Sequence, residues 1–314
     1  MKKVLITGAN GMIGNALVNK FINKYELILV DQNSDRLDQF KDNALIIKNS
    51  VKNISEWKDA LDGVYCVVHL AAAVHWAPKT RQEEQQFEET NTDGTRILYK
   101  ACSGRGVERF LFFSSNAVYE DSEELISEGS PVNPRGAYGR SKLAAEQFLL
   151  GEMKTGKTAV CIFRPASVYG ENDKGSMRLL VSLCRKGVVP MIGNGANKKA
   201  LLYIADIVQA VEKYIESEKD LNGEIFNVSS GDFRYREMIN VICKSYGFNP
   251  FRVYIPAWFC KNIASRIRPI GKLAAAAETR AVSIEKASRL LGYQTKYSLE
   301  DGLMDAKGYY EKGS

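Results

Sequence analysis

The stretch that decides the fold is Val4-Leu5-Ile6 followed by Thr7-Gly8-Ala9-Asn10-Gly11-Met12-Ile13-Gly14. A short apolar run of this kind is typical of a strand buried in a parallel sheet. The glycines stand between that strand and the helical pattern of residues 16–24, the context in which this spacing is specific. Glycine permits a tight turn and a close approach to a pyrophosphate, and a helix N-terminus offers N–H groups to phosphates. The motif therefore predicts a dinucleotide site made by Gly8, Asn10, Gly11, Met12, Ile13 and Gly14.

The first 170 residues continue to alternate between strand and helix patterns. Strands are expected at 27–30, 44–47, 64–70, 110–114 and 158–163, and helices at 55–62, 93–103 and 138–153, the first of them with Ser55 as its N-cap. This alternation predicts the α/β class, with a doubly wound parallel sheet of the Rossmann type and right-handed crossovers. We expect residues 1–170, with 201–229 returning to the sheet, to form this domain. Residues 171–200 and 230–314 are expected to form a smaller α/β lobe that binds substrate.

Composition excludes several classes of protein. The chain has 314 residues, 43 Lys and Arg against 37 Asp and Glu, and a net charge of +6, which is too small to indicate a nucleic-acid partner. Its 45% hydrophobic and 25% charged residues are ordinary for a globular protein. Six cysteines without a C-x-x-C pair, and two histidines, predict no metal site. We expect reduced cysteines and a cytoplasmic protein.

The sequence contains neither a signal-peptide pattern nor a membrane-spanning run, but residues 254–280 allow two interpretations. The apolar run after Met1 is too short for a signal peptide, and no run approaches the roughly 18 apolar residues of a membrane-spanning helix. In residues 254–280, Trp258 and Phe259 stand among lysines and arginines. That pattern fits either an amphipathic helix on a membrane surface or a helix packed into the lobe.

Asp31 ends the second expected strand, about 20 positions after Gly11. A carboxylate there accepts hydrogen bonds from the ribose hydroxyls and repels a 2′-phosphate. Gln32 follows it, and the nearest arginine is Arg36. This favours NAD over NADP.

A second group of residues carries acid–base chemistry. Tyr138 and Lys142, in Tyr-Gly-Arg-Ser-Lys, lie four apart and therefore on one face of the expected helix. A neighbouring ammonium stabilises a phenolate, and a shift of the tyrosine pKa from about 10 to about 7 corresponds to roughly 4 kcal/mol. Ser114 and Ser115 end another strand at the carboxyl edge, where open α/β sheets bind ligands. A serine hydroxyl there can bond the substrate oxygen that Tyr138 protonates or deprotonates.

Together these motifs resemble the extended short-chain dehydrogenases/reductases, in the NAD-dependent epimerase/dehydratase group that includes UDP-glucose 4-epimerase. The resemblance covers nearly the whole chain. Its segments are TGANGMIG at 7–14, HLAA at 69–72, NTDGT at 91–95, SSNAVY at 114–119, YGRSK at 138–142, RPASVYG at 164–170, YIAD at 203–206 and FNVSSG at 226–231.

The resemblance implies a role for each matching residue. Tyr138 is the acid and base, Lys142 lowers its pKa and holds the nicotinamide ribose, and Ser115 orients the substrate oxygen. The remaining cofactor contacts that it implies are Leu70, Ala71, Ala72, Asn91, Ser114 and Pro165. The substrate contacts that it implies are Ala73, His75, Asn116 and Ala117, and loop packing is an equal alternative for His75. Before the YIAD segment, where epimerases often carry an arginine, this chain has Lys199, which is expected either to meet a diphosphate as a point charge or to be a solvated lysine. His69, at the end of its strand, is expected to be structural.

Two departures from the family pattern narrow the chemistry. Sugar 4,6-dehydratases carry Thr-Asp-Glu where this chain has Ser115-Asn116-Ala117. Without that acid pair, elimination of water lacks its proton donor and base, so we discount dehydration. Family members also often carry an aspartate for adenine where Asn49-Ser50-Val51 stands here, so that contact is not expected in the usual form.

The leading hypothesis is an NAD-dependent epimerase acting at C4 of a nucleotide sugar, most simply a UDP-sugar, or a 4-keto reductase that uses the same residues. The alternative is a hydroxysteroid- or dihydroflavonol-type dehydrogenase of the same superfamily. A non-enzymatic dinucleotide-binding module is disfavoured because Tyr138 and Lys142 are both present. The family commonly forms homodimers through the helices at 93–103 and 138–153, so we expect a homodimer.

Overall fold

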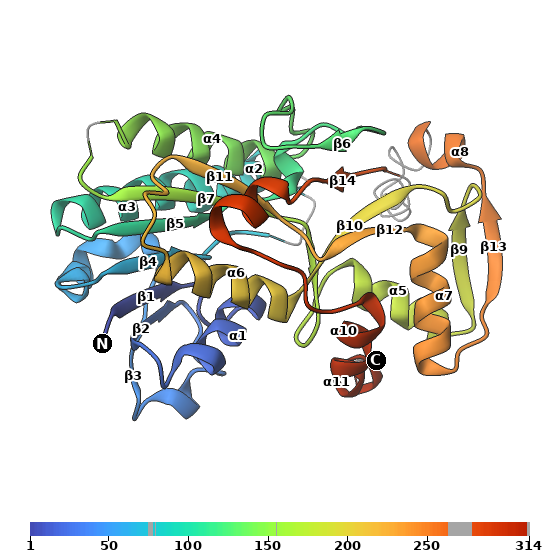
Figure 1. Ribbon diagram of the computed structural model, residues 1–314, viewed down its shortest axis with the longest axis horizontal. Coiled ribbons are helices and arrows are strands. Elements are labelled where there is room, and N and C mark those ends of the chain that lie inside the picture. Colours follow the sequence, from blue (N-terminus) through green and yellow to red (C-terminus); the bar gives the residue numbers. More distant parts are fainter. Residues whose placement is uncertain (75–77, 79, 155, 263–277, 313–314) are drawn as a thin grey trace. The chain divides into compact units, whose positions relative to one another are not determined.

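The computed structural model describes residues 1–314 except 75–77, 79, 155, 263–277 and 313–314 (Figure 1). The chain folds as two compact units. The first contains residues 1–120, 131–165 and 208–227, and the second contains residues 121–130, 166–207 and 228–314.

The first unit is built on a seven-stranded sheet in the order β11-β7-β5-β4-β1-β2-β3. Each pairing from β3 across to β7 is parallel. This is the predicted doubly wound α/β sheet, with the switch in strand order beside β1. The strands are β1 (Lys3–Thr7), β2 (Glu26–Asp31), β3 (Ala44–Lys48), β4 (Cys66–His69), β5 (Arg109–Phe113), β7 (Ala159–Pro165) and β11 (Glu224–Val228).

Helices cover both faces of this sheet. Figure 1 shows α3 (Gly94–Gly104) and α4 (Ala137–Glu152) on one side, and α1 (Met12–Phe21) and α6 (Ile204–Glu216) on the other. The core beneath α3 and α4 joins buried side chains of both helices to those of the strands, including Leu98, Leu149 and Phe110. Because strands such as β4 and β5 are buried on both faces, they read as continuous apolar runs rather than as alternating ones.

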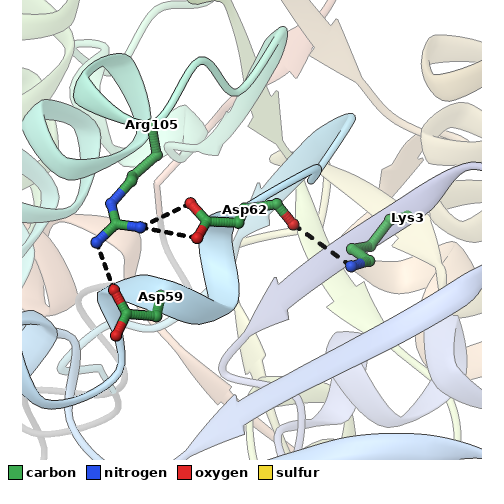
Figure 2. Close-up of polar contacts among 4 residues, drawn as sticks. All are labelled: Lys3, Asp59, Asp62 and Arg105. Atoms are coloured by element: carbon green, nitrogen blue, oxygen red, sulfur yellow. Dashed lines mark hydrogen bonds and ion pairs between the residues drawn. The ribbon is translucent and has the colours of Figure 1, made fainter.

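One crossover differs from the expectation. Instead of a helix at 55–62 capped by Ser55, two short 3₁₀ segments cover Val51–Glu56 and Lys58–Leu61. The first is capped by Ser50, whose hydroxyl accepts from the Lys52 N–H at 3.2 Å. Figure 2 shows how the second segment is tied to the end of α3: Arg105 bridges Asp59 and Asp62.

The Arg105 contacts lie at the amino ends of the strands, away from the predicted site. The Lys3 ammonium donates to the Asp62 carbonyl at 3.4 Å (Figure 2). A cavity of about 520 Å³ opens there, lined by the first residues of β1, β2 and β3 among others. Open α/β sheets bind their ligands at the opposite, carboxyl edge. We therefore assign no chemistry to this cavity.

The second unit contains three small sheets. β10 (Lys198–Tyr203) pairs parallel with β8 (Ser167–Tyr169) and antiparallel with β12 (Gly231–Arg234). β13 (Phe251–Ile255) pairs with β9 (Val188–Ile192), and β14 (Ala281–Val282) pairs with β6 (Leu125–Ile126). The helices of this unit are α5 (Ser176–Arg185), α7 (Tyr235–Tyr246), α8 (Ala257–Asn262), α10 (Leu299–Asp305) and α11 (Lys307–Lys312).

The limits of the two units differ from the expected ones at four places. Residues 121–130, 166–170, 201–207 and 228–229 belong to the second unit. The physical reason is strand pairing: β8 and β10 are neighbours in one sheet, and β6 pairs with β14. Strands that are hydrogen-bonded to one another belong to the same compact unit, even where the alternation of strand and helix patterns assigns them to different ones.

Three further findings bear on the sequence expectations. No helix in the described part of the chain is long and apolar enough to cross a bilayer. Within the interval 254–280, residues 263–277 lie outside the described residues, and Trp258 on α8 is exposed. All six cysteines are free thiols.

Candidate active site

The glycine turn connects β1 to α1 through contacts that leave no room for a side chain. Gly8 has φ +71°, and a Cβ on it would lie 2.7 Å from the Ala71 backbone nitrogen. A Cβ on Gly14 would lie 2.6 Å from the Cα of Ala9. Gly11 is the N-cap of α1 and provides no side-chain cap for it. The first turn of α1 is therefore open to an anionic group, which is what a pyrophosphate requires.

Asp31 lies beside this turn at the carboxyl end of β2. Its Oδ2 accepts from the Asn10 backbone N–H at 3.0 Å, and its Oδ1 accepts from the Asn33 backbone N–H at 3.1 Å. The Asn10 side chain accepts from the Arg36 backbone N–H at 2.9 Å. These bonds fix the carboxylate next to the glycine turn, where the ribose hydroxyls of a dinucleotide are bound in this fold.

His69 ends β4 and is fully buried between two threonines. The Thr95 hydroxyl donates to the Asn91 carbonyl at 2.6 Å, so it accepts from the His69 Nε2–H at 3.0 Å. His69 Nδ1 then accepts from the Thr7 hydroxyl at 2.7 Å. Burial, followed by the nearby Lys142 charge, lowers the pKa of His69 to about 3. The imidazole is therefore neutral and structural.

The segment after His69 lies against the glycine turn. Leu70 donates its N–H to the Thr7 carbonyl at 3.1 Å, and Ala71 donates to the Thr7 hydroxyl at 3.3 Å. Ala71 is also the residue that a Cβ on Gly8 would touch. The structure thus brings together Leu70, Ala71, Gly8 and the β1 end. Of the predicted substrate residues, His75 lies outside the described residues.

Asn91 holds the next part of this loop in place. It is fully buried in a π-helical segment, Glu88–Asp93. Its Oδ1 accepts from the Ala73 N–H at 2.7 Å, while its Nδ2 donates to the Ala73 carbonyl at 3.1 Å and to the Ser141 hydroxyl at 2.9 Å. Asn91 therefore joins the loop after β4 to α4, the helix that carries Tyr138 and Lys142.

The serines at the end of β5 have different environments. Ser114 is bonded to β7 through its N–H, which donates to the Phe163 carbonyl at 2.8 Å. Its buried hydroxyl has no hydrogen-bond partner among the described residues. A buried hydroxyl without a partner is costly, so this atom fits a contact to a bound ligand. The Ser115 hydroxyl accepts from the Ala117 N–H at 3.1 Å and hydrogen-bonds the Tyr138 side chain.

Tyr138 and Lys142 share one face of α4, as their spacing predicts. The Lys142 Nζ lies 6.0 Å from the centre of the Tyr138 ring and donates to the Phe113 carbonyl at 2.7 Å. Lys142 is only 2% exposed, whereas Tyr138 keeps part of its surface open. Gly139 lets the helix reach this position, because a Cβ there would lie 2.6 Å from the Ala117 carbonyl oxygen.

Burial shifts the pKa values of Tyr138 and Lys142 in opposite directions. It raises the pKa of Tyr138 to about 12, against a smaller opposite effect of the Ser115 hydrogen bond. It lowers the pKa of Lys142 to about 7, against a smaller opposite effect of Glu146. Each shift disfavours the charged form, which is the usual consequence of desolvation. A phenolate at Tyr138 is thus favoured only when Lys142 carries its proton.

The remaining predicted residues fall into two groups. Asn116 and Ala117 lie in the 3₁₀ turn after Ser115, and Pro165 ends β7, the neighbour of β5. Lys199 lies in the second unit on β10 and is half-buried. Its pKa is lowered to about 8, mainly by burial. The described residues contain no cluster of three or more His, Cys, Asp or Glu suited to a metal ion.

Sequence reasoning missed two buried charged residues next to this group. Glu146 lies one helical turn beyond Lys142, and Arg164 lies on β7, where it forms an ion pair with Glu146 at 2.6 Å. A signal was present: Arg164 directly follows the apolar run 160–163, and an arginine that continues a buried strand must find a partner.

The glycine turn, the acid after β2 and the Ser-Tyr-Lys group define an extended short-chain dehydrogenase/reductase. Residues 4–229 match the model of the NAD dependent epimerase/dehydratase family, and the chain belongs to that family. The predicted enzyme class and the choice of NAD as cofactor are thereby confirmed. The glycine cradle, the open first turn of α1 and the buried Ser114 hydroxyl are features that such a dinucleotide fits.

Similarity to characterised proteins extends over almost the full chain. UDP-glucose 4-epimerase of Vibrio cholerae is 29% identical over 96% of this chain and 93% of its own length. The N-acetyl-α-D-glucosaminyl-diphospho-ditrans,octacis-undecaprenol 4-epimerase of Escherichia coli O157:H7 is 25% identical over 96% of this chain and 92% of its own. The structure resembles UDP-glucuronic acid 4-epimerase from Bacillus cereus with UDP-glucuronic acid and NAD (TM-score 0.84, 22% identity, 99% of both chains). That structural likeness supports the fold.

Proposed function

We propose that this protein is an NAD-dependent 4-epimerase of a UDP-sugar, with Tyr138 as acid and base, Lys142 as its electrostatic partner and Ser115 as the group that orients the substrate oxygen. The observation that carries the proposal is the placement of Tyr138 and the buried Lys142 on one face of α4, with the Lys142 Nζ 6.0 Å from the centre of the Tyr138 ring. Relatives with this chemistry, matched over nearly the full chain, support the sugar-nucleotide substrate.

The cofactor site is proposed from the residues that the fold gathers. Gly8, Gly11 and Gly14 make room for the pyrophosphate, and Asp31 binds the adenosine ribose. Met12 and Ile13 provide backbone N–H groups in the first turn of α1. Asn10, Leu70, Ala71, Ala72, Asn91, Ser114 and Pro165 line the rest of the path toward Lys142. NAD supplies the acceptor, and on return the donor, of the hydride at C4.

The chain's own residues move the proton. The Tyr138 phenolate takes the proton from the substrate C4 hydroxyl while the Ser115 hydroxyl holds that oxygen. The Lys142 ammonium stabilises the phenolate, because two opposite charges a few ångströms apart in a buried site attract strongly. When the other face of C4 is reduced, the Tyr138 hydroxyl returns the proton to the oxygen. A base and an acid of this kind contribute about 10²- to 10⁴-fold to a rate.

The residues after Ser115 favour epimerisation over dehydration. Positions 116 and 117 are an asparagine and an alanine, so this turn has no carboxylate to remove a proton or to protonate a leaving hydroxyl. Asn116 is buried, and Ala117 packs against α4 at Gly139. Neither side chain can exchange protons at neutral pH. The turn therefore supports redox chemistry at C4 without elimination.

Two basic residues of the second unit support an anionic substrate. Lys199 on β10 lies opposite Arg280 across a β-bridge, and the Arg280 backbone accepts and donates hydrogen bonds on both sides of Lys199. The Arg280 side chain is held by Asp121 at 2.6 Å. Burial lowers the pKa of Lys199, and the nearby carboxylates of Glu278 and Asp121 raise it in part; an anionic ligand would add to their effect. We propose that Lys199 meets the diphosphate of the substrate. Separately, for the first unit, we propose Ala73, Asn116 and Ala117 as substrate contacts.

We also propose a homodimer formed through α3 and α4. These helices lie side by side on one face of the sheet (Figure 1). Ile97 on α3 is 39% exposed, and the Arg96 and Lys100 side chains lie over the Phe148 ring at 5.5 and 5.9 Å. Cations stacked on an aromatic ring are common at protein interfaces, where they cover apolar surface.

The test is a panel of UDP-sugars given to the purified protein, together with absorbance and mass analysis of its bound nucleotide. Interconversion of a C4 pair, such as UDP-glucose and UDP-galactose, without net change in reduced cofactor supports the proposal. Tyr138→Phe and Lys142→Met are expected to lower kcat by at least about 10²-fold. Ser114→Ala, which removes the unpartnered hydroxyl, serves as a separate probe of cofactor affinity.

Other outcomes would change the assignment. Consumption of reduced cofactor only with a 4-keto sugar would indicate a reductase. Consumption only with a steroid or dihydroflavonol ketone would favour the second superfamily class. Cofactor binding with no turnover, unaffected by Tyr138→Phe, would indicate a binding module.

A further inference from the structure

A buried network of charged and polar side chains continues from Lys142 into the protein. Glu146 Oε1 accepts from Arg164 Nε at 3.0 Å, and Glu146 Oε2 accepts from Nη2 at 2.6 Å. Arg164 Nη1 donates to the Tyr119 hydroxyl at 2.8 Å, and that hydroxyl donates to Asn227 Oδ1 at 2.8 Å. The side chains of these four residues are at most 4% exposed.

A contribution to folding stability does not by itself explain why the protein buries such a network of charges. Removing two charges from water costs several kcal/mol per ion, and well-packed apolar residues in place of a buried ion pair are often as stable or more so. Glu146 is also placed four residues after Lys142, on the same face of α4. At 1.5 Å per residue, its Cα is about 6 Å along the helix from that of Lys142 and about 12 Å from that of Tyr138. An anion so placed acts on Lys142 more than on Tyr138.

The unequal distances matter because Tyr138 and Lys142 share protons. When the pair has lost one proton, it exists either as phenolate with ammonium or as phenol with amine. Only the first form can take a proton from substrate. A carboxylate near Lys142 favours the ammonium, so it favours the active form without touching the reacting atoms.

We propose that Glu146, fixed by Arg164, is a positioning residue that keeps the shared proton on Lys142 and so leaves Tyr138 as the phenolate. This rests on the proposed roles of Tyr138 and Lys142. The direction agrees with the effect of Glu146 on Lys142, whose pKa it raises against burial.

The other groups that face this network do not replace Glu146. His69 on β4 lies near Lys142 but is neutral, because its pKa is lowered to about 3. Tyr119 faces Arg164 from the turn after Ser115, with its ring centre 4.8 Å from the guanidinium carbon. Arg164 on β7 is a cation and acts on Lys142 in the opposite direction to Glu146. Among these neighbours, Glu146 is the anion.

The test uses the full-length protein with saturating NAD and follows the phenolate absorbance of Tyr138 as a function of pH, taken as the difference from Tyr138→Phe. In Glu146→Gln, we expect the phenolate amplitude at neutral pH to fall by up to about tenfold, with kcat falling in parallel. The midpoint of the first deprotonation moves down by about one pH unit, because a nearby anion no longer opposes loss of a proton.

Two further variants separate charge from packing. Tyr119→Phe removes a hydrogen bond to Arg164 without changing any charge, so we expect lower thermal stability with an unchanged midpoint and amplitude. Arg164→Gln removes a cation, so the midpoint moves up, opposite to Glu146→Gln. Loosened packing cannot move the midpoint in opposite directions, so the pair of variants separates charge from packing. If one of the two charge variants does not fold, the sign of the shift in the other still tests the proposal, with Tyr119→Phe as the uncharged reference.

The proposal is overturned if Glu146→Gln keeps the wild-type midpoint, or if Arg164→Gln shifts it in the same direction as Glu146→Gln. Failure of the proposed function gives a different pattern. In that case the wild type interconverts no UDP-sugar pair, or Tyr138→Phe and Lys142→Met turn over as fast as the wild type, whatever the midpoint of Glu146→Gln.

Discussion

Gly139 and Ala117 approach so closely that a Cβ on Gly139 would lie 2.6 Å from the Ala117 carbonyl oxygen and 2.8 Å from the Pro134 Cβ. This contact sets the depth at which α4 packs on the turn that carries Ser115. The glycine between Tyr138 and Lys142 therefore fixes the distance between the serine and the tyrosine, although it has no reactive atom of its own.

The first prediction follows from that contact. Gly139→Ala forces α4 away from the turn, so we expect a loss of about 1–3 kcal/mol in unfolding free energy and a lower kcat. Gly151→Ala is the matched control, because Gly151 follows on the same helix and its Cβ would meet nothing within 4 Å. There we expect a gain of up to about 1 kcal/mol from helix propensity and unchanged kcat. Urea unfolding and steady-state kinetics measure both. Equal behaviour of the two variants would contradict the argument.

Asp31 supports a second prediction, on the choice of cofactor. Asp31→Ser removes the carboxylate that accepts the Asn10 and Asn33 N–H groups and that would repel a 2′-phosphate. We expect the Kd for NAD to rise about tenfold or more, since a charged hydrogen bond contributes about 1.5–3 kcal/mol. The preference for NAD over NADP should fall at the same time, which calorimetric titration with each nucleotide measures. An unchanged preference would place the ribose elsewhere.

A third prediction concerns assembly. Ile97→Glu introduces a charge on the face of α3 proposed to pair with a second copy, and Leu179→Glu on α5 is the control with nearly the same exposure (39% against 40%). We expect sedimentation to show a dimer for the wild type and for Leu179→Glu. Ile97→Glu should sediment as a monomer of 35.0 kDa. A wild-type monomer, or a dimer that survives Ile97→Glu, would exclude this interface.

The parts of the fold that could be predicted from the sequence are those set by local spacing. Short apolar runs predicted β1, β2 and β5 to within one residue at each end, because a strand buried on both faces has no other pattern. The spacing of Tyr138 and Lys142 predicted their common face for the same local reason. The pattern could not predict that Asn91 lies in a π-helix, because an inserted residue changes hydrogen bonding without changing which residues are apolar.

The features that the sequence did not predict depend on contacts between residues far apart in the chain. The 3₁₀ segments at 51–61 replace a full helix where the crossover packs beneath α3, and their capping residue is Ser50 rather than Ser55. Glu146 and Arg164 are 18 residues apart, on a helix and a strand that only the folded sheet brings together. Charged residues in apolar surroundings signal that a partner exists but not which residue it is.

The last prediction concerns His69 and the pH dependence of stability. Burial lowers the pKa of this histidine from its ordinary value of 6.5 to about 3. Between these values the unfolded chain binds a proton at this position and the native protein does not. Stability from this site is therefore complete above pH 6.5 and is lost as the pH falls toward 3, at about 1.4 kcal/mol per pH unit.

His69→Gln cannot bind that proton in either state, so its stability should fall less steeply on acidification. The variant is expected to be less stable than the wild type at neutral pH, because the bonds to Thr7 and Thr95 at 2.7 and 3.0 Å are altered. The two curves should converge on acidification, since all other groups titrate alike in both proteins. Urea unfolding at a series of pH values measures the difference in slope. Parallel curves would mean that His69 takes up a proton in the native protein.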